Sequence, residues 1–264
     1  MTSSMIRKHL DRLLALQTRE DGRGLLEYRK DITVELGIST KSAEGSARVK
    51  IGRTEVVAGV KLCVDKPYPD TPEQGNLVVS VELLPLSSPD FESGPPNIEA
   101  IELSRIVDRC IRETECIDLE KLCIKKKEKV WTVFIDIYPI NDDGNLFDAA
   151  ALAAIAALQD ARLPDYDAKE EKVVYESRTK TKLPLQHIPM EITVVKIANQ
   201  LLIDPTLNEW TCLDARLTVA VLEDGTICGM QKGGEAGLTV DEVNRMIEIA
   251  LTKAGELRSR LFKG

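Results

Sequence analysis

The sequence is poor in the residues that build metal and redox sites. It contains two histidines, His9 and His187, which lie in distant segments and offer no nucleophile–base pair. None of its six cysteines belongs to a Cys-x-x-Cys pair, so the usual zinc-ligand spacing is missing. We interpret the cysteines as small hydrophobic residues of a protein in a reducing compartment. We therefore expect no metal site and no cofactor.

Nucleotide-binding and membrane-spanning patterns are also missing. No Gly-x-Gly-x-x-Gly segment follows a predicted strand, and no P-loop with Lys-Ser or Lys-Thr occurs. No run approaches the roughly 18 apolar residues of a membrane helix, and the N-terminal residues lack an apolar signal core. The net charge of −8 argues against coating nucleic acid by bulk electrostatics. We expect a cytoplasmic protein without membrane contact, in which any RNA contact depends on a local basic patch.

The pattern that is present is that of an α+β protein with two similar halves. The 264 residues suffice for one large domain or two smaller ones. Predicted strands span 31–38, 46–51, 54–65, 76–84, 130–138, 192–203, 214–221 and 226–231. Predicted helices span 4–17, 98–112, 145–162 and 240–262. The segment 164–189 is either a domain boundary or a pair of edge strands.

These elements suggest a duplicated α+β unit, because each half has a sheet hairpin followed by helices. We divide the chain into an N-terminal helix and arm at 1–30, a first domain at 31–165 and a second domain with a C-terminal helix at 166–264. The alanine-rich helix at 145–162 is apolar nearly all round, so we expect it to be buried.

The helix predicted at 98–112 carries three arginines on one side. Its apolar residues recur at helical spacing. At about 100° per residue, Arg105, Arg109 and Arg112 lie within roughly 60° of one another on the opposite side. The arginines form either a solvated face, neutralised by acidic residues three or four positions away, or a site for an anion or RNA. This segment by itself favours the solvated face.

Five segments in order carry a resemblance to a known family. They are Arg19–Arg23, Tyr28-Arg29, Glu44–Thr54, Ile101–Arg105 and the helix from Asp148 to Pro164. Together they resemble the RNase PH family of phosphate-dependent 3′→5′ exoribonucleases over nearly the whole chain. The resemblance implies a duplicated βαβ-rich α+β fold, also described as ribosomal protein S5 domain 2-like. It also implies a subunit of a hexameric ring around a central RNA channel.

Within that family, three further segments are similar to the non-catalytic RNase PH-like subunit of the archaeal exosome. They are Asp65–Asn76, Val81–Leu86 and Phe91–Pro96. This resemblance implies pairing with a catalytic RNase PH-like subunit, with three heterodimers per ring and RNA-binding cap subunits on one face. It further implies that Arg105, Arg109 and Arg112 hold the backbone of single-stranded RNA near the partner's active site.

Three departures from the active members of the family indicate that this chain has no catalytic residues. Active members place Gly-Ser-Arg or Gly-Thr-Arg, which holds the attacking phosphate, where this sequence has Asn145, Leu146 and Phe147. They carry a Glu-Asp pair where this sequence keeps Glu209 but has Trp210 in place of the aspartate. The loop before the arginine-bearing helix is acidic here and contains paired arginines in active members.

Two alternatives remain at the level of sequence. The chain could be an active phosphorolytic exoribonuclease that forms a homohexamer, or an α+β scaffold unrelated to phosphorolysis whose arginines are merely solvated. Two aspartates match acids of the family pattern, but we interpret Asp204 as a turn or cap residue and Asp214 as a strand-end residue.

Overall fold

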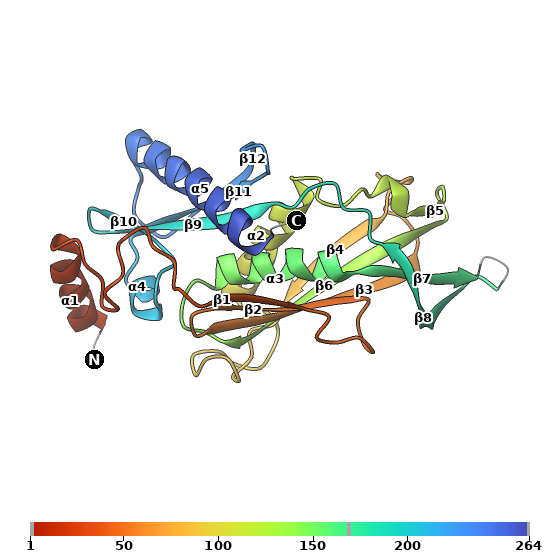
Figure 1. Cartoon of the computed structure of the whole chain (residues 1–264), viewed down its shortest axis with the longest axis horizontal. Helices are drawn as coiled ribbons and strands as arrows, with labels where there is room; N and C mark the ends of the chain where they lie inside the picture. The colour runs from red at the N-terminus through yellow and green to blue at the C-terminus, as the bar shows by residue number, and fades with distance from the viewer. Residues whose placement is uncertain (1–2, 168–169, 263–264) are drawn as a thin grey trace.

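Two β-sheets and a helix that contacts both of them form the main body of the molecule (Figure 1). The computed structural model describes residues 3–167 and 170–262. The first sheet has the strand order β1-β2-β3-β6-β4, with β5 beside β6; β4 runs parallel to β6, and the other pairs are antiparallel. Its strands are β1 (Ile32–Leu36), β2 (Gly45–Ile51), β3 (Thr54–Asp65), β4 (Asn76–Val81), β5 (Cys123–Lys125) and β6 (Lys129–Asn141).

The second sheet is antiparallel and has the order β10-β9-β11-β12. Its strands are β9 (Met190–Ile197), β10 (Gln200–Ile203), β11 (Ala215–Val221) and β12 (Ile227–Gly233). Helix α5 (Val240–Leu261) packs on β9 and β11. A capping box between Thr239 and Glu242 fixes its first turn, because each side chain accepts a hydrogen bond from the other residue's backbone N–H.

Helix α3 (Leu146–Asp160) links the two sheets, since it packs against β2 and β3 on one side and β9 on another. Its residues from Phe147 to Leu158 are all buried, which confirms the expected buried helix. Short alanine side chains let the backbones approach closely. At Gly45 in β2, a Cβ atom would lie only 2.4 Å from the carbonyl oxygen of Ala157, so this strand position requires glycine.

Helix α2 (Ile98–Arg112) has the predicted bounds. The side chain of Asn97 accepts a hydrogen bond from the backbone N–H of Ala100 at 2.9 Å and so caps the helix. The apolar stripe is buried against β4 and α3, while the C-terminal half also contacts β12. The side opposite the apolar stripe is therefore open.

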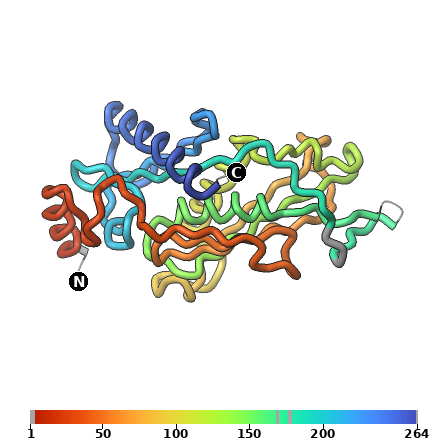
Figure 2. The backbone as a smooth tube through the Cα atoms, in the orientation of Figure 1, coloured from red at the N-terminus to blue at the C-terminus, as the bar shows by residue number. Residues whose placement is uncertain are grey.

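The remaining elements lie toward the two ends of the elongated molecule, as the backbone trace shows (Figure 2). Helices α1 (Ser3–Ala15) and α4 (Leu207–Thr211) are together at one end. Strands β7 (Arg162–Asp167) and β8 (Lys172–Lys182) form a two-stranded sheet at the other end. The short 3₁₀ helix η1 (Glu120–Leu122) precedes β5. No helix in the described part of the chain is both long and apolar enough to cross a membrane.

The α+β class and the N-terminal helix are confirmed, and two details of the sequence prediction need correction. The strand expected at 192–203 is a hairpin of β9 and β10, because Ala198 adopts a left-handed conformation with φ of 52° and reverses the chain. The strand expected at 76–84 ends at Val81. Residues 164–189 contain paired strands, the second of the two alternatives. The domain boundaries at 30 and 165 stay predictions.

Candidate nucleic-acid interface and the adjoining cleft

The three arginines predicted from the sequence are all exposed on α2, but their surroundings differ. Arg105 makes no hydrogen bond or ion pair with any residue that the structure describes. Arg109 donates one hydrogen bond, from Nη1 to Oε1 of Gln231 at 2.8 Å, and its stem lies beside Gly229. These two guanidinium groups keep most of their five N–H donors available for an anion.

Arg112 is held more firmly than the other two. Its Nε and Nη2 donate to the two carboxylate oxygens of Asp108 at 3.1 and 2.7 Å, and Nη2 also donates to the carbonyl of Leu77 at 3.1 Å. The hydrogen bond with Asp108 raises the pKa of Arg112. The expected neutralisation of the helix face therefore occurs at Arg112, four residues from its acid.

Arg105 has no such partner, because the nearby Glu102 turns elsewhere. The Glu102 carboxylate forms an ion pair with Nη2 of Arg216, a buried residue of β11. Local spacing alone would have paired Glu102 with Arg105. A long-range ion pair thus removes the counterion from Arg105 and leaves it open to other anions.

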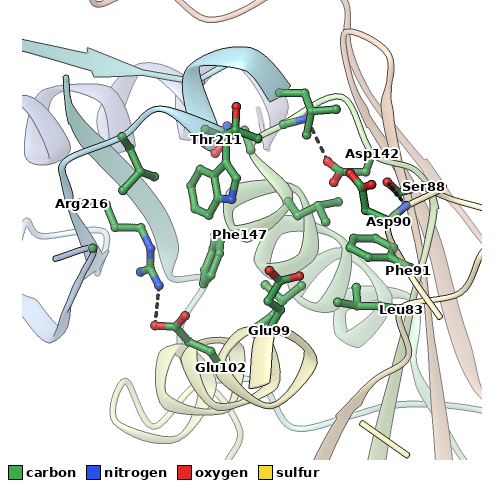
Figure 3. Close-up of a pocket in the computed structure, with 18 of the residues that line it drawn as sticks. Leu83, Ser88, Asp90, Phe91, Glu99, Glu102, Asp142, Phe147, Thr211 and Arg216 are labelled. Atoms are coloured by element: carbon green, nitrogen blue, oxygen red, sulfur yellow. Dashed lines mark hydrogen bonds and ion pairs between the residues drawn. The ribbon is translucent and has the colours of Figure 1, made fainter. Parts of the chain in front are cut away.

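The N-terminal end of α2 forms one wall of a cleft of about 750 Å³ (Figure 3). The opposite walls come from the loop after β4, the start of α3, helix α4 and the loop after β12. The start of α3 is the position that the family resemblance assigns to phosphate binding. The cleft therefore includes the residues that the resemblance aligns with the phosphate-binding residues of active members.

Aromatic side chains occupy this position. The rings of Phe147 and Trp210 are 5.1 Å apart between centroids. The guanidinium of Arg216 lies 4.3 Å from the Phe147 centroid and 5.7 Å from that of Trp210, in cation–π geometry. Phe147 and Trp210 are two of the residues that depart from the active pattern, and the structure brings them into contact with each other.

The charge of the cleft is strongly negative. Its lining includes six acidic residues: Asp90, Glu99, Glu102, Asp142, Asp214 and Glu235. Arg216 is the one basic residue among the described residues that line it. Asp214 pairs with Arg7 outside the lining and Glu102 with Arg216. The other four carboxylates form no ion pair with a residue that the structure describes. Sequence patterns gave no signal for Arg216, because it occupies an ordinary strand position.

Asp204 has a structural role that the turn interpretation does not capture. It is fully buried, and its carboxylate accepts hydrogen bonds from Nη1 of Arg23 at 2.8 Å and Nη2 of Arg29 at 2.7 Å. The backbone N–H of Arg29 and the side chain of Asn145 add two further hydrogen bonds, at 2.7 and 3.0 Å. Asp204 therefore ties the N-terminal arm to both the start of α3 and the second sheet.

A neighbouring ion pair supports the same junction. Arg19 and Glu209 have fully buried side chains, with Nε of Arg19 2.9 Å from Oε1 of Glu209. Glu209 also closes a capping box with Thr206 at the start of α4. Glu209, the retained acid of the family pattern, is thus committed to structure. Asp214 precedes β11 as expected for a strand-end residue, and it binds Arg7.

Asp148 in the first turn of α3 is a buried acid without a cationic partner among the described residues. Its carboxylate accepts hydrogen bonds from the Tyr28 hydroxyl and the Thr193 backbone N–H, each at 2.8 Å, and from Asn145 at 3.2 Å. Burial raises the pKa of Asp148 to about 7, although these three donors favour the ionised form.

We expect the stability of the protein to depend on pH through Asp148. Its pKa is near 3.8 in the unfolded chain and about 7 when folded, so between these values the folded state binds more protons. The contribution of this group is thus fully present below pH 3.8 and lost as pH rises through about 7. Thermal unfolding should show Asp148→Asn gaining stability relative to wild type between pH 5 and pH 8. The exposed Asp165→Asn is the control; a pH-independent difference for Asp148→Asn would contradict the assignment.

No group of three or more His, Cys, Asp or Glu side chains in the described ranges has a geometry that could hold a metal ion. The charged residues of this region offer two kinds of binding. One is charge-assisted binding of an anion by Arg105 and Arg109; the other is binding of a cation in the acidic cleft.

Comparisons with known proteins give consistent results across the chain. The family models described as "3′ exoribonuclease family, domain 1" and "domain 2" match residues 28–164 and 187–253. The exosome complex component Rrp42 of Methanothermobacter thermautotrophicus is 48% identical over 97% of this chain and 94% of its own length. The Rrp42 component of Methanocella arvoryzae is 47% identical over 92% and 90%, respectively.

Two solved structures are similar over almost their full length. A chain of an Archaeoglobus fulgidus exosome with RNA bound to the active site superposes with a TM-score of 0.90 at 40% identity, covering 98% of both chains. A chain of an archaeal exosome core gives a TM-score of 0.86 at 38% identity, covering 98% of this chain and 96% of the other.

Proposed function

This chain belongs to the RNase PH family of 3′ exoribonucleases, and from that premise we propose that it is a non-catalytic, RNA-binding subunit of an archaeal exosome. The observation that carries the proposal is the cleft at the start of α3. Phosphorolysis needs donors that hold the attacking phosphate. Here the phosphate would instead meet the rings of Phe147 and Trp210 and an excess of carboxylates.

The arginine face of α2 supports the RNA-binding part of the proposal. Arg105 and Arg109 are exposed and have most of their donors available. Arginine–phosphate hydrogen bonds are charge-assisted and carry no base information, which suits an assembly that must degrade RNA of any sequence. Arg112 contributes less in this proposal, because Asp108 already neutralises it.

The names of the similar proteins support the proposed partners. Proteins that share 40–48% identity with this chain are named as exosome components, and one similar solved structure is an exosome with RNA in its active site. We infer that this chain pairs with a catalytic RNase PH-like subunit, that three such heterodimers close a ring, and that RNA-binding cap subunits cover one face. Such an assembly would act in the cytoplasm. This chain would order the partner's active site and hold RNA beside it.

Purified chain tests the proposal directly. Incubated alone with single-stranded RNA, magnesium and phosphate, it is expected to release no nucleoside diphosphate, because its own phosphate site is missing. Mixed with the catalytic RNase PH-like subunit, it should co-elute from a sizing column and the complex should release nucleoside diphosphates. Chromatography of the reaction products measures the release of nucleoside diphosphate by the chain alone and by the complex. Release by the chain alone at the rate of the complex would favour the active homohexamer, and failure to co-elute would favour the unrelated scaffold.

A further inference from the structure

The cleft has no ligand in the function proposed above, yet its dimensions are those of a binding site. Its volume of about 750 Å³ falls within the roughly 300–1,000 Å³ of typical ligand pockets. Figure 3 shows Asp90, Asp142 and Glu99 on one side of Phe147, and Glu102 with Arg216 on the other. The space on the Asp90 side is therefore lined by carboxylates and apolar side chains.

Three of these four carboxylates have no polar partner at all among the described residues. Asp90, Glu99 and Glu235 are exposed, and their side chains form no hydrogen bond or ion pair with residues 3–167 or 170–262. The carboxylate of Asp142 accepts one hydrogen bond, from the backbone N–H of Gly144 at 2.9 Å. Negative charge beside an aromatic surface is complementary to a guanidinium or ammonium group. Arg216 already adopts that arrangement between Phe147 and Glu102.

Two buried polar atoms in the lining also have no partner among the described residues. Asn145 is 1% exposed, and its Oδ1 accepts no hydrogen bond. Its Nδ2 faces Asp148 and Asp204, which turns Oδ1 away from those carboxylates. Arg216 is 3% exposed, and its Nη1 donates no hydrogen bond. Both atoms have less than 1 Å² of accessible area, so an occupant reaches them only after a shift of these two side chains. Because unpaired buried atoms are costly, the occupant that satisfies both atoms after such a shift supplies a donor and an acceptor.

These requirements exclude two classes of occupant. Phosphate groups of RNA would be repelled by the carboxylates. A small polycation supplies donors for the carboxylates and Asn145 but no acceptor for Nη1 of Arg216. A polypeptide segment with a lysine or arginine supplies both, because its side chain donates and its backbone carbonyls accept.

We propose that the cleft receives a basic polypeptide segment of the catalytic ring partner. This inference rests on the proposed function, which supplies the partner. Two subunits of one fold that pair about an approximate twofold axis exchange equivalent surfaces. This chain offers Arg105 and Arg109 to the partner's site, so the partner's equivalent surface faces this cleft. Carboxylates of this chain then serve as the counterions of the partner's basic side chains, in the place that RNA phosphates take at Arg105 and Arg109.

Site-specific photo-cross-linking of the assembled complex tests the location. With p-benzoylphenylalanine in place of Thr211, an exposed residue of the cleft lining, we expect a cross-link to a partner peptide that contains lysine or arginine. The same group in place of Tyr68, which is exposed and outside the lining, is the control and should not capture that peptide. Cross-linking from Thr211 to RNA alone, or to no partner peptide, would overturn the inference.

A matched pair of charge variants tests the chemistry. Asp90→Asn, Glu99→Gln and Glu235→Gln together should weaken affinity for the partner by about tenfold, with a smaller effect at high salt. The control removes the same charge at exposed sites outside the lining, by Asp70→Asn, Glu113→Gln and Glu248→Gln, and should stay within about twofold of wild type.

Binding measurements with the partner and with single-stranded RNA separate the outcomes. If the cleft variant binds the partner like its control but binds RNA more tightly, the cleft merely repels RNA and the inference fails while the proposed function stands. If the wild-type chain itself does not bind the partner, both fail.

Discussion

Replacing both Arg105 and Arg109 by glutamate is expected to weaken RNA binding by the assembled complex roughly 100-fold or more. Each charge-assisted hydrogen bond to phosphate contributes about 1.5–3 kcal/mol, and about 1.4 kcal/mol corresponds to a factor of ten. The reversed charges add repulsion. The dependence of log Kd on log salt should also fall by about two, one for each lost phosphate contact. Titration of labelled single-stranded RNA at several salt concentrations measures both effects.

The matched control is Arg12→Glu with Arg245→Glu. Both residues are exposed, lie on α1 and α5, and form no ion pair within the described part of the chain. The control changes the net charge equally, so it separates local contacts from bulk electrostatics. Sizing chromatography should show both variants in assembled rings. An equal loss of affinity in the control, or unchanged affinity in the α2 variant, would return the arginines to a solvated face.

Asp204→Ala is expected to lower the free energy of unfolding by roughly 3–5 kcal/mol, the usual cost of removing one partner of a buried ion pair. The substitution would leave Arg23 and Arg29 without their buried counterion and Asn145 without one of its acceptors. Chemical denaturation of the isolated chain measures the change.

Asp108→Asn provides the comparison for Asp204. It breaks an exposed ion pair with Arg112 four residues away, which is worth only about 0.3–0.5 kcal/mol. Asp204 matches an acid of the family pattern. If its role were catalytic and not structural, its replacement would leave the free energy of unfolding unchanged. If Asp204→Ala unfolds like Asp108→Asn, the buried network is not what holds the arm to the second sheet.

Much of the fold could be predicted because its signals are local. The apolar spacing of residues 98–112 places α2 at its observed bounds, and the all-apolar alanine-rich segment predicts the buried helix α3. The departures at Phe147 and Trp210 are equally visible in the sequence, since they are residue identities. The contact between these two rings could be seen only in the structure.

The partners of charged groups could not be predicted in the same way. From the sequence, Asp204 was predicted to be a turn or cap residue. In the structure its carboxylate binds two arginines that lie 175 and 181 positions away in the chain. Such pairing depends on how the N-terminal arm crosses the second sheet, and no local pattern records that path. The hairpin at Ala198 was missed for a related reason, because both strands are apolar and read as one.

Periodicity and residue identity are properties of neighbouring positions, and they sufficed to predict helices α1, α2, α3 and α5, most strands and the arginine row. Residue identity also reveals the departure from the active pattern at Asn145, Leu146 and Phe147. The short helix α4 was not predicted. Which arginines have an acidic partner depends on contacts across the fold. Glu102 pairs with Arg216 on another sheet and leaves Arg105 open, while Asp108 holds Arg112. The tertiary structure also gathered acids from α2 and four separate loops into one cleft. Coulombic interactions follow distance in space, and folding alone sets that distance.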